Sequence, residues 1–406
     1  MNVGIMIDSL EGGGAEKVAK IISDYLLQRG NQVFLFILAK KGKGAYQLSG
    51  EIVFFEEIPV RTNCGRAVFF EDLFRAGRKI KRIKKRFHIE ATLSFMEKAN
   101  MLNVLSRGRD RVIISIHTIL SVRKELAGPF YDRQNLHYLY SKADRIITLS
   151  QDGRRELTEY YSLPSDRVTV LPNPIADYLF NTEDRPWIYG SKCIVTVARL
   201  DPVKQQDHLI RAFSKVVEKY PDACLILCGQ GLLEGYLRGL AKNLSIEENV
   251  IFPGFTREVP YFLKHARAFV LTSKCEGFPL SMLEAMQKGT PVIASAMPGG
   301  ANDILQSAVT GSNLPQNVCI DLETSHKKEV HFSPYGLITP ALRGTAKLNS
   351  ALDDGEEALA QAMILLLENE ELYQYYSAKS RERARYYNPE KVLEEWIHVI
   401  STREGN

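Results

Sequence analysis

The chain has 406 residues, of which 45% are hydrophobic and 25% are charged, and its formal net charge at pH 7 is +4. This length exceeds what one hydrophobic core usually supports, so we expect two domains that fill their cores without metals or disulfides. No apolar run approaches 18 residues and the amino terminus passes directly into a strand pattern, so we expect neither a membrane-spanning helix nor a signal peptide.

Positive charge is concentrated in the first half of the chain. Residues 1–186 contain 29 Lys and Arg against 22 Asp and Glu, a net charge of +7, whereas the remaining residues contain 23 against 26, a net charge of −3. We therefore expect the basic surface to lie in the first half, and we predict no nucleic-acid partner.

Cysteine usage predicts a reduced protein. The six cysteines include no C-x-x-C pair, and several lie inside apolar strand-like runs, which indicates a cytoplasmic protein without disulfides. They are Cys64, Cys193, Cys224, Cys228, Cys275 and Cys319.

The first predicted elements are a strand over residues 3–7, a glycine-rich loop at 12–14 and a helix that runs to about Arg29, where Gly30 ends it. Lys17 occupies the third glycine position of a G-x-G-x-x-G fingerprint, so the dinucleotide pattern is not met. The loop by itself indicates a tight turn as readily as a phosphate site.

A helix over residues 69–87 follows strands at 32–37 and 52–58, and it is strongly basic. Such a charge run is usually a solvated helix face, but no acidic run neutralises this one, and an anionic partner is the interpretation we prefer. Phe69 and Phe70, just before the run, add the option of shallow insertion into a membrane. The eight cations are Arg75, Arg78, Lys79, Lys81, Arg82, Lys84, Lys85 and Arg86.

His117 follows the most evidently buried strand of the first half, residues 112–116. Most histidines are surface or satisfied core residues, but the carboxyl end of a strand is where an open α/β sheet binds ligands. Strands at 144–150 and 168–171 complete this sheet, and a polar stretch at 181–191 has the composition of a linker.

The second half opens with a strand at 193–198 that delivers Arg199 and Lys204 into a loop before a helix. These two cations are either ordinary surface residues or a clamp for a diphosphate. Strands at 225–228 and 250–255 follow, each ending near a glycine.

The most informative stretch is residues 273–286, where a strand end, a turn and a helix start carry two carboxylates, Glu276 and Glu284. Gly277 lets the backbone approach a ligand, and the N–H groups at the helix start suit a phosphate. Carboxylates accept hydrogen bonds from sugar hydroxyls, so a sugar nucleotide fits the combination. The alternative is a solvated loop acid and a helix-dipole acid.

Glu276 and Glu284, with Glu-Gly-Phe-Pro-Leu between them and Gly289-Thr290-Pro291 beyond, closely resemble the E-x7-E signature of retaining glycosyltransferases of family 4. The resemblance implies that Glu276 contacts the transferred sugar and Glu284 the nucleotide ribose. Arg199-Leu200 with Lys204 resembles the R-L-x-x-x-K phosphate motif of that family.

Further roles follow from the resemblance alone. Gly13 and Gly14 would face the donor diphosphate, and the helix start at Gly277, Phe278, Pro279 and Leu280 would also hold the donor. His117 would lie near the transferred sugar and the acceptor. The segment 94–100 resembles bacterial family 4 enzymes that extend lipid-linked or surface polysaccharides.

The implied fold is α/β, with two doubly wound Rossmann-like domains that face each other across a cleft, the GT-B fold. We expect an acceptor-binding domain at 1–186, a nucleotide-sugar domain at 187–385 and a helix at 386–406 that returns to the first domain. Residues 313–334 depart from the family pattern and are interpreted as an inserted surface loop.

The predicted activity is the retaining transfer of a hexose or N-acetylhexosamine from a nucleoside diphosphate sugar to a glycan or lipid-linked acceptor. Family frequency alone favours UDP as the nucleotide. No cofactor or metal is expected, because the chain lacks a D-x-D sequence. Residues 75–86 are expected to attach the protein peripherally to the inner face of the cytoplasmic membrane. The alternatives are a sugar-nucleotide epimerase of related fold and a non-catalytic subunit that binds the nucleotide sugar.

Overall fold

The fold is seen in a computed structural model, which describes residues 1–9, 13–39, 48–62, 65–122, 128–175, 186–306, 329–346 and 350–402. Its internal contacts divide the chain into two compact units, Met1–Ala176 with Tyr387–Asn406 (unit 1) and Asp177–Tyr386 (unit 2). The sequence placed the boundaries after residues 186 and 385. None of the described helices is long and apolar enough to cross a membrane.

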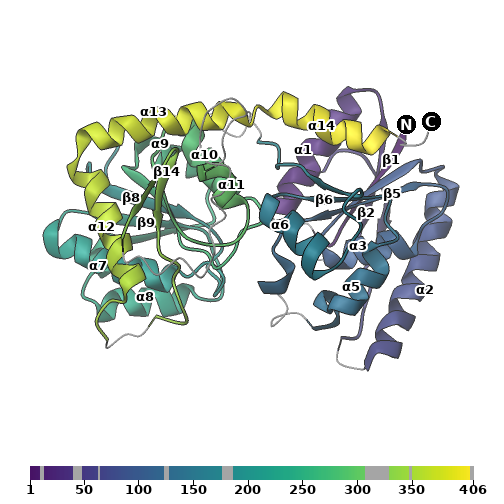
Figure 1. The fold of residues 1–406 in the computed structure, drawn as a ribbon, viewed down its shortest axis with the longest axis horizontal. Helices are drawn as coiled ribbons and strands as arrows, with labels where there is room; N and C mark the ends of the chain where they lie inside the picture. The colour runs from purple at the N-terminus through teal and green to yellow at the C-terminus, as the bar shows by residue number, and fades with distance from the viewer. Residues whose placement is uncertain are drawn as a thin grey trace. The chain divides into compact units, whose positions relative to one another are not determined.

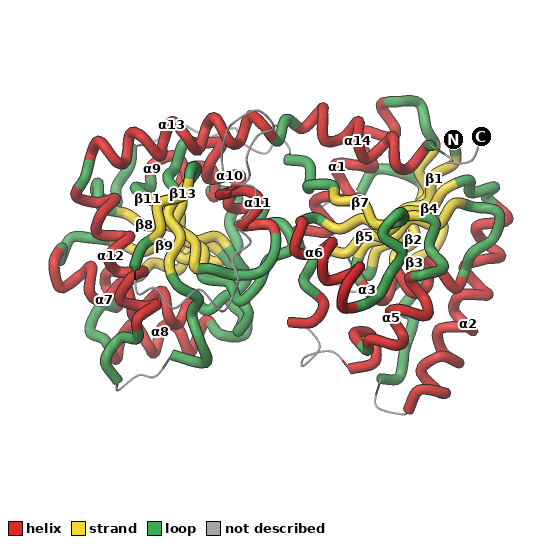
Figure 2. Tube along the Cα trace, viewed as in Figure 1, coloured by secondary structure: helices red, strands yellow, loops and turns green. Residues whose placement is uncertain are grey.

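Unit 1 is a parallel sheet with the strand order β3-β2-β1-β4-β5-β6-β7, and Figure 2 shows helices on both of its faces. The strands are β1 (Asn2–Ile7), β2 (Gln32–Ile37), β3 (Glu51–Phe55), β4 (Ala91–Phe95), β5 (Arg111–Ile116), β6 (Arg145–Thr148) and β7 (Val168–Val170). The main helices are α1 (Gly14–Gln28), α2 (Gly65–Arg86), α3 (Glu97–Leu105), α5 (Arg133–Tyr140), α6 (Gln151–Arg155) and α14 (Pro389–Ser401).

Continuous apolar runs explain why the strands of unit 1 lie inside the molecule. The inner residues of β1, β4 and β5 are buried, as expected for a parallel sheet covered on both faces. The carboxyl-terminal helix α14 belongs to this unit (Figure 1), where Trp396 is fully buried and its indole N–H donates to the carbonyl oxygen of Pro172 at 2.8 Å.

Unit 2 repeats the architecture with the strand order β10-β9-β8-β11-β12-β14-β13, in which only the pairing of β13 with β14 is antiparallel among the described strands. The strands are β8 (Cys193–Val197), β9 (Cys224–Cys228), β10 (Val250–Gly254), β11 (Ala268–Leu271), β12 (Val292–Ser295), β13 (His331–Ser333) and β14 (Gly336–Thr339). The helices are α7 (Gln206–Lys219), α8 (Glu234–Asn243), α9 (Val259–His265), α10 (Leu280–Lys288), α11 (Gly300–Gln306), α12 (Asp354–Glu368) and α13 (Glu370–Tyr386). The predicted class of two doubly wound α/β domains is confirmed.

Two expectations about unit 2 need correction. Cys193 and Cys224 are register partners at the starts of β8 and β9, and their sulfurs form a disulfide, so the expectation of a chain without disulfides was wrong at this pair. The predicted surface loop at 313–334 lies mostly outside the described residues, but its end, His331–Ser333, forms the edge strand β13 because it pairs with β14.

The basic helix α2 is less exposed than its sequence indicated. Lys84 is buried, and its ammonium lies 2.9 Å from Asp110 Oδ2 and 2.7 Å from Asn103 Oδ1. Its position follows from helical spacing, since Leu73, Gly77 and Ile80 continue to Lys84 on the inner side. Phe69 is fully buried and unavailable for membrane insertion.

Ion pairs also occupy two of the exposed cations of α2. Arg75 pairs with Glu71 one turn away, and Lys79 pairs with Glu56. The remaining exposed cations of the run, whose charge no described acidic side chain pairs, are Arg78, Lys81, Arg82, Lys85 and Arg86.

Candidate functional site

The site predicted in unit 2 lies between β8 and β11, where the strand order of the sheet changes direction. From β8 the chain continues to β9 and β10 on one side, and β11 and β12 lie on the other side. Loops at the carboxyl ends of two such strands diverge and leave a crevice for ligands. Residues 198–205 follow β8 and residues 272–279 follow β11, so the sheet brings both predicted loops to this edge.

Main-chain contacts hold the two loops together. The Lys274 N–H donates to the carbonyl oxygen of Val203 at 2.7 Å, and the Thr272 hydroxyl donates to the carbonyl oxygen of Lys204 at 2.8 Å. Gln205, between Lys204 and α7, has left-handed backbone angles (φ 49°, ψ 39°), which turn the chain into the helix. The position of Lys204 is therefore fixed by backbone geometry.

Lys204 and Glu276 form the centre of the site. The Lys204 ammonium lies 2.6 Å from Glu276 Oε1, and the Ser273 hydroxyl donates to the same oxygen at 2.5 Å. Their side chains are 17% and 13% exposed, so the pair is shielded but still reachable. Ser273 had no predicted role, although a hydroxyl directly after a buried strand is a signal for one.

Close backbone packing holds Glu276 in place. Glu276 forms an isolated bridge with Gly299, and the N–H of Gly300 donates to the carbonyl oxygen of Glu276 at 3.0 Å. Gly299 has φ +114°, and a Cβ there would lie 1.7 Å from the Glu276 carbonyl oxygen. Only glycine fits this position.

The second carboxylate lies on the helix that follows. Helix α10 begins at Leu280, after Pro279 as its N-cap, so Gly277 and Phe278 precede the helix instead of starting it. Glu284 lies in the second turn of α10 and is only 7% exposed. The described contacts do not join Glu284 to Glu276.

Arg199 has different contacts from Lys204. Its guanidinium pairs with Asp201 at 3.1 Å and its side chain is 65% exposed, while its carbonyl oxygen accepts a hydrogen bond from Gln206. The structure thus brings Lys204, Ser273 and Glu276 together and leaves Arg199 at the exposed end of the same loop.

The predicted residues of unit 1 lie at the carboxyl edge of its sheet. His117 follows β5, and its Nε2 lies 2.7 Å from the Ser115 hydroxyl. Burial lowers the pKa of His117 to about 3, so its imidazole is neutral near pH 7. Gly13 is the N-cap of α1 and Gly14 is its first residue, while Gly12 lies outside the described residues.

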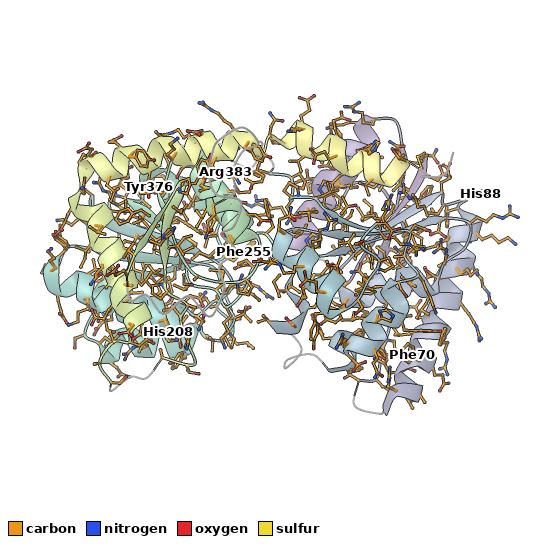
Figure 3. The ribbon with its side chains drawn as sticks, viewed as in Figure 1. Phe70, His88, His208, Phe255, Tyr376 and Arg383 are labelled. Carbon is orange, nitrogen blue, oxygen red and sulfur yellow. A yellow bond between two sulfur atoms is a disulfide. The ribbon has the colours of Figure 1, made fainter. Side chains whose placement is uncertain are left out.

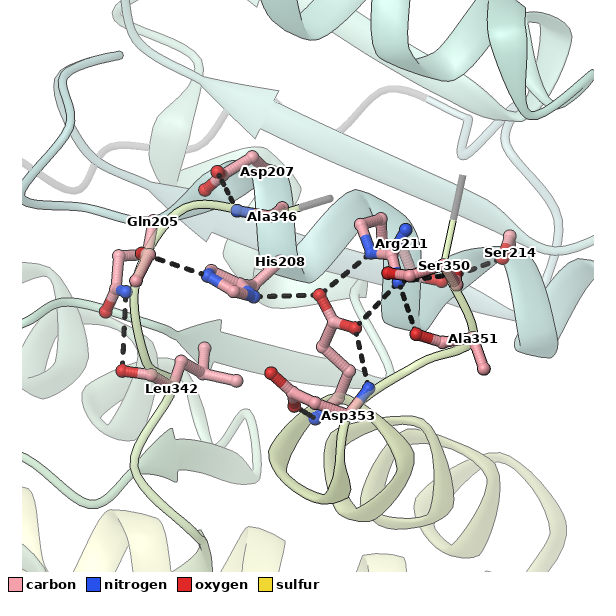
Figure 4. A network of polar contacts seen from close by, with 12 residues as sticks. Gln205, Asp207, His208, Arg211, Ser214, Leu342, Ala346, Ser350, Ala351 and Asp353 are labelled. Carbon is pink, nitrogen blue, oxygen red and sulfur yellow. Dashed lines mark hydrogen bonds and ion pairs between the residues drawn. The ribbon is translucent and has the colours of Figure 1, made fainter. Parts of the chain in front are cut away.

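A second polar cluster in unit 2 lies at the start of α7, where Figure 3 labels His208. His208 Nδ1 and Arg211 Nε lie 2.8 and 2.9 Å from Glu356 Oε1, and Arg211 also donates to the carbonyl oxygens of Ser350 and Ala351 (Figure 4). Among the described residues, His208, Asp353 and Glu356 are close enough to ligate a metal. The guanidinium already supplies positive charge to Glu356, so the cluster fits an anchor for α7 better than a metal site.

Comparison with protein families agrees with the geometry. Residues 12–177 match the family described as Glycosyltransferase Family 4, and residues 181–323 match the family described as Glycosyl transferases group 1. The two matches follow each other along the chain, the first mostly in unit 1 and the second in unit 2.

Individual relatives are similar over much of the chain. An uncharacterised glycosyltransferase of Methanocaldococcus jannaschii is 30% identical over 276 residues, 65% of this chain and 64% of that protein, so the match spans less than two thirds of the relative. The N-acetylgalactosamine-N,N'-diacetylbacillosaminyl-diphospho-undecaprenol 4-alpha-N-acetylgalactosaminyltransferase of Campylobacter jejuni is 23% identical over 98% of this chain and 99% of its own.

Solved structures share the fold. HepE of Anabaena in complex with UDP and glucose has a TM-score of 0.72 at 18% identity and covers 99% of both chains. Sucrose-phosphate synthase from Thermosynechococcus elongatus also has a TM-score of 0.72 at 18% identity, with 98% of both chains covered. At this level of identity the likeness shows the two-domain glycosyltransferase fold.

Proposed function

The chain belongs to the family 4 glycosyltransferases, and from this premise we propose that it transfers a hexose or N-acetylhexosamine from a UDP-sugar to a glycan or lipid-linked acceptor with retention of anomeric configuration. The observation that carries the proposal is the Lys204, Ser273 and Glu276 group at the reversal point of the unit 2 sheet. Binding of UDP by HepE and the undecaprenol-linked substrate in the name of the Campylobacter relative support the donor and acceptor classes.

The proposed donor chemistry follows from charge. A diphosphate at the loop after β8 would compete with Glu276 for Lys204, and Glu276 Oε1 would then accept a hydrogen bond from a sugar hydroxyl. Negative charge grows on the diphosphate as the glycosidic bond breaks, so Lys204 and the exposed Arg199 stabilise the transition state more than the ground state. The acceptor oxygen attacks the anomeric carbon from the face that the diphosphate leaves, and its proton passes to the departing diphosphate, so the configuration is retained.

We propose that Glu284 holds the nucleotide ribose, that the backbone from Gly277 to Leu280 contacts the donor, and that Gly13 and Gly14 approach its diphosphate. His117 is assigned to the acceptor side, where a neutral imidazole can orient a hydroxyl through Nδ1, because its Nε2 already contacts the Ser115 hydroxyl. These roles come from the motif positions. Gly13, Gly14 and Leu280 lie at helix starts, His117 follows β5, and Glu284 lies in the second turn of α10.

We also propose that catalysis needs no metal. The full sequence contains no D-x-D, the usual carboxylate pair for a divalent ion on a sugar diphosphate, and Arg199 and Lys204 supply positive charge at the same place. Activity is therefore expected to survive chelation with EDTA.

Peripheral attachment to an anionic membrane is the third part of the proposal. A lipid-linked acceptor lies at a membrane surface, and the five exposed cations of α2 without an acidic partner, Arg78, Lys81, Arg82, Lys85 and Arg86, offer reversible electrostatic attachment. The buried Lys84 and Phe69 contribute nothing to this surface.

The test measures UDP release from UDP-glucose, UDP-galactose, UDP-GlcNAc and UDP-GalNAc in EDTA, with and without polyprenyl-diphosphate-linked sugars. We expect slow hydrolysis of one donor and faster release when an acceptor is present. A changed epimer of the donor sugar would indicate the epimerase alternative. UDP-sugar binding without any release would indicate a non-catalytic subunit, and a strict Mg²⁺ or Mn²⁺ requirement would overturn the metal-free mechanism.

A further inference from the structure

A cavity lined by arginines lies in unit 1, at the amino edge of its sheet. Its volume is about 400 Å³, within the range of about 300–1,000 Å³ that is usual for small-molecule sites. Arg111 begins β5, Arg145 begins β6 and Arg167 directly precedes β7. These three strands are neighbours in the sheet, so their amino ends bring the three side chains to one place. Arg107 and Arg109, from the loop after α3, complete the arginine set.

Positive charge is in excess in this cavity. Its lining carries five guanidinium groups against three carboxylates, those of Asp110, Asp144 and Asp166. Asp110 already binds the buried ammonium of Lys84 at 2.9 Å. With Lys84 included, six positive charges stand against three negative ones, so the net charge is +3. An anion with more than one negative charge matches this excess.

Backbone carbonyl groups orient several of the arginines. Arg145 Nη1 donates to the carbonyl oxygen of Asp166 at 2.7 Å, and Arg167 Nη1 donates to two carbonyl oxygens of the loop before β6 at 2.8 and 3.3 Å. Arg111 Nη1 donates to the carbonyl oxygen of Val399 on α14 at 2.7 Å. A carbonyl oxygen carries no net charge, so these contacts fix the guanidinium planes without neutralising them.

Arg109 and Arg167 offer the donors that a ligand needs. Arg167 is half-buried, and no described residue accepts a hydrogen bond from its Nε or Nη2. Arg109 is exposed and makes no hydrogen bond or ion pair with the described residues, whereas Arg107 pairs with Asp144. A guanidinium group presents parallel N–H donors that match two oxygens of one phosphate. Phosphate therefore fits the donors as well as the charge.

We propose that this cavity binds a phosphate-bearing ligand, whose phosphate oxygens accept hydrogen bonds from Arg109 and Arg167. The site is additional to the donor and acceptor sites of the proposed function and does not depend on them. Strand β5 has six residues, and at about 3.3 Å per residue it separates this edge of the sheet from His117 by about 20 Å.

The test measures binding of inorganic pyrophosphate by isothermal titration calorimetry. The parent protein is the full chain with Arg199→Ser and Lys204→Ser, because these two cations would bind pyrophosphate themselves. We expect one pyrophosphate per chain, with an affinity that falls as salt rises. Arg109→Ser should weaken binding at least tenfold, and Arg167→Lys, which keeps the charge but loses the paired donors, at least threefold. Arg385→Ser, which removes an exposed arginine of α13, is the matched control and should bind like the parent.

A second titration identifies the source of the phosphate. Dihexanoyl phosphatidic acid, kept below its critical micelle concentration, presents a phosphate on a soluble lipid. Binding of pyrophosphate alone assigns the cavity to a free phosphorylated compound, and binding of the lipid that is lost in Arg109→Ser assigns it to a lipid headgroup. Either result supports a phosphate site.

The alternative is that the arginines only tie the loops at this edge together. Absence of binding by both probes, or equal binding to the parent and to Arg109→Ser, would overturn the proposal. Because the Arg109 side chain has no contact to lose, Arg109→Ser should unfold at the same temperature as the parent, so weaker binding cannot be attributed to unfolding. UDP release by the wild-type chain tests the proposed function separately.

Discussion

At the scale of single residues, Glu276 and Glu284 should fail differently when their charge is removed. Glu276 accepts hydrogen bonds from Lys204 and Ser273. If its contact with the transferred sugar strengthens in the transition state, Glu276→Gln should lower kcat by about 10²-fold. Glu284→Gln should mainly raise KM for the UDP-sugar. Steady-state UDP release separates the two effects, and Glu248→Gln, an exposed carboxylate before β10, is the control. Equal and small effects of both site variants would place the active site elsewhere.

We expect stability to depend on pH through the buried network of His208, Arg211 and Glu356. Burial lowers the pKa of His208, but the Glu356 hydrogen bond and nearby carboxylates outweigh it, and the pKa lies above its usual 6.5. Burial raises the pKa of Glu356, but hydrogen bonds from His208 and Arg211 outweigh it, and the pKa lies below its usual 4.5.

His208 therefore contributes fully to the free energy of unfolding below pH 6.5, and this contribution is lost as pH rises through its raised pKa. Glu356 contributes fully above pH 4.5, and its contribution is lost as pH falls through its lowered pKa. Urea unfolding should show greatest stability between these limits. In His208→Gln, the free energy of unfolding should fall less steeply as pH rises above 6.5. Glu356→Gln should cost about 3–5 kcal/mol, since it leaves the buried Arg211 without its carboxylate. An unchanged alkaline limb in His208→Gln would contradict this account.

At the scale of elements, the turn that fixes Glu276 depends on one glycine. Gly299→Ala should lower both kcat and the unfolding temperature, because a Cβ at this position would overlap the Glu276 carbonyl oxygen. The control is Gly239→Ala in α8, where a Cβ would meet nothing within 4 Å. This variant should raise the free energy of unfolding by about 0.5–1 kcal/mol. Wild-type kcat in Gly299→Ala would show that this turn does not position the carboxylate.

Helix α2 can be tested as a membrane-binding element. Replacing Lys81, Arg82 and Lys85 with Ser should weaken sedimentation with vesicles rich in phosphatidylserine, at about 1 kcal/mol per charge, and binding should fade as salt rises. A control with the same loss of charge replaces Lys242, Arg257 and Arg385, which are exposed on unit 2. If both triple variants bind equally, α2 is a solvated helix face.

At the scale of the whole molecule, the last helix completes the core of unit 1. Trp396 is fully buried, stacks on Phe95 with ring centroids 6.4 Å apart and donates to the carbonyl oxygen of Pro172. Trp396→Ala should cost about 3–5 kcal/mol in urea unfolding. Tyr375→Ala, an exposed aromatic on α13, should cost less than 1 kcal/mol. Similar costs for the two variants would mean that α14 is not part of the core.

The sequence by itself determined the fold class and the motif positions of the candidate site in unit 2. Apolar runs at β1, β5 and β8 predicted buried strands, and the helix predicted to run to about Arg29 is α1, which ends at Gln28. The spacing of Glu276 and Glu284 indicated the family, because the motif lies within one short stretch of consecutive residues.

Only the tertiary structure decided which side chains meet. Lys204 and Glu276 are 72 residues apart, and the neighbouring positions of β8 and β11 in the sheet bring them within 2.6 Å. The sequence placed Lys84 among the surface cations of α2. In the structure it is buried and forms an ion pair with Asp110, which follows α3. The burial of Asp8 Oδ1, which has no hydrogen-bond partner among the described residues, and the positive φ of 73° at Met96 are likewise invisible in sequence. Burial and backbone angles depend on what packs around a residue after the chain has folded.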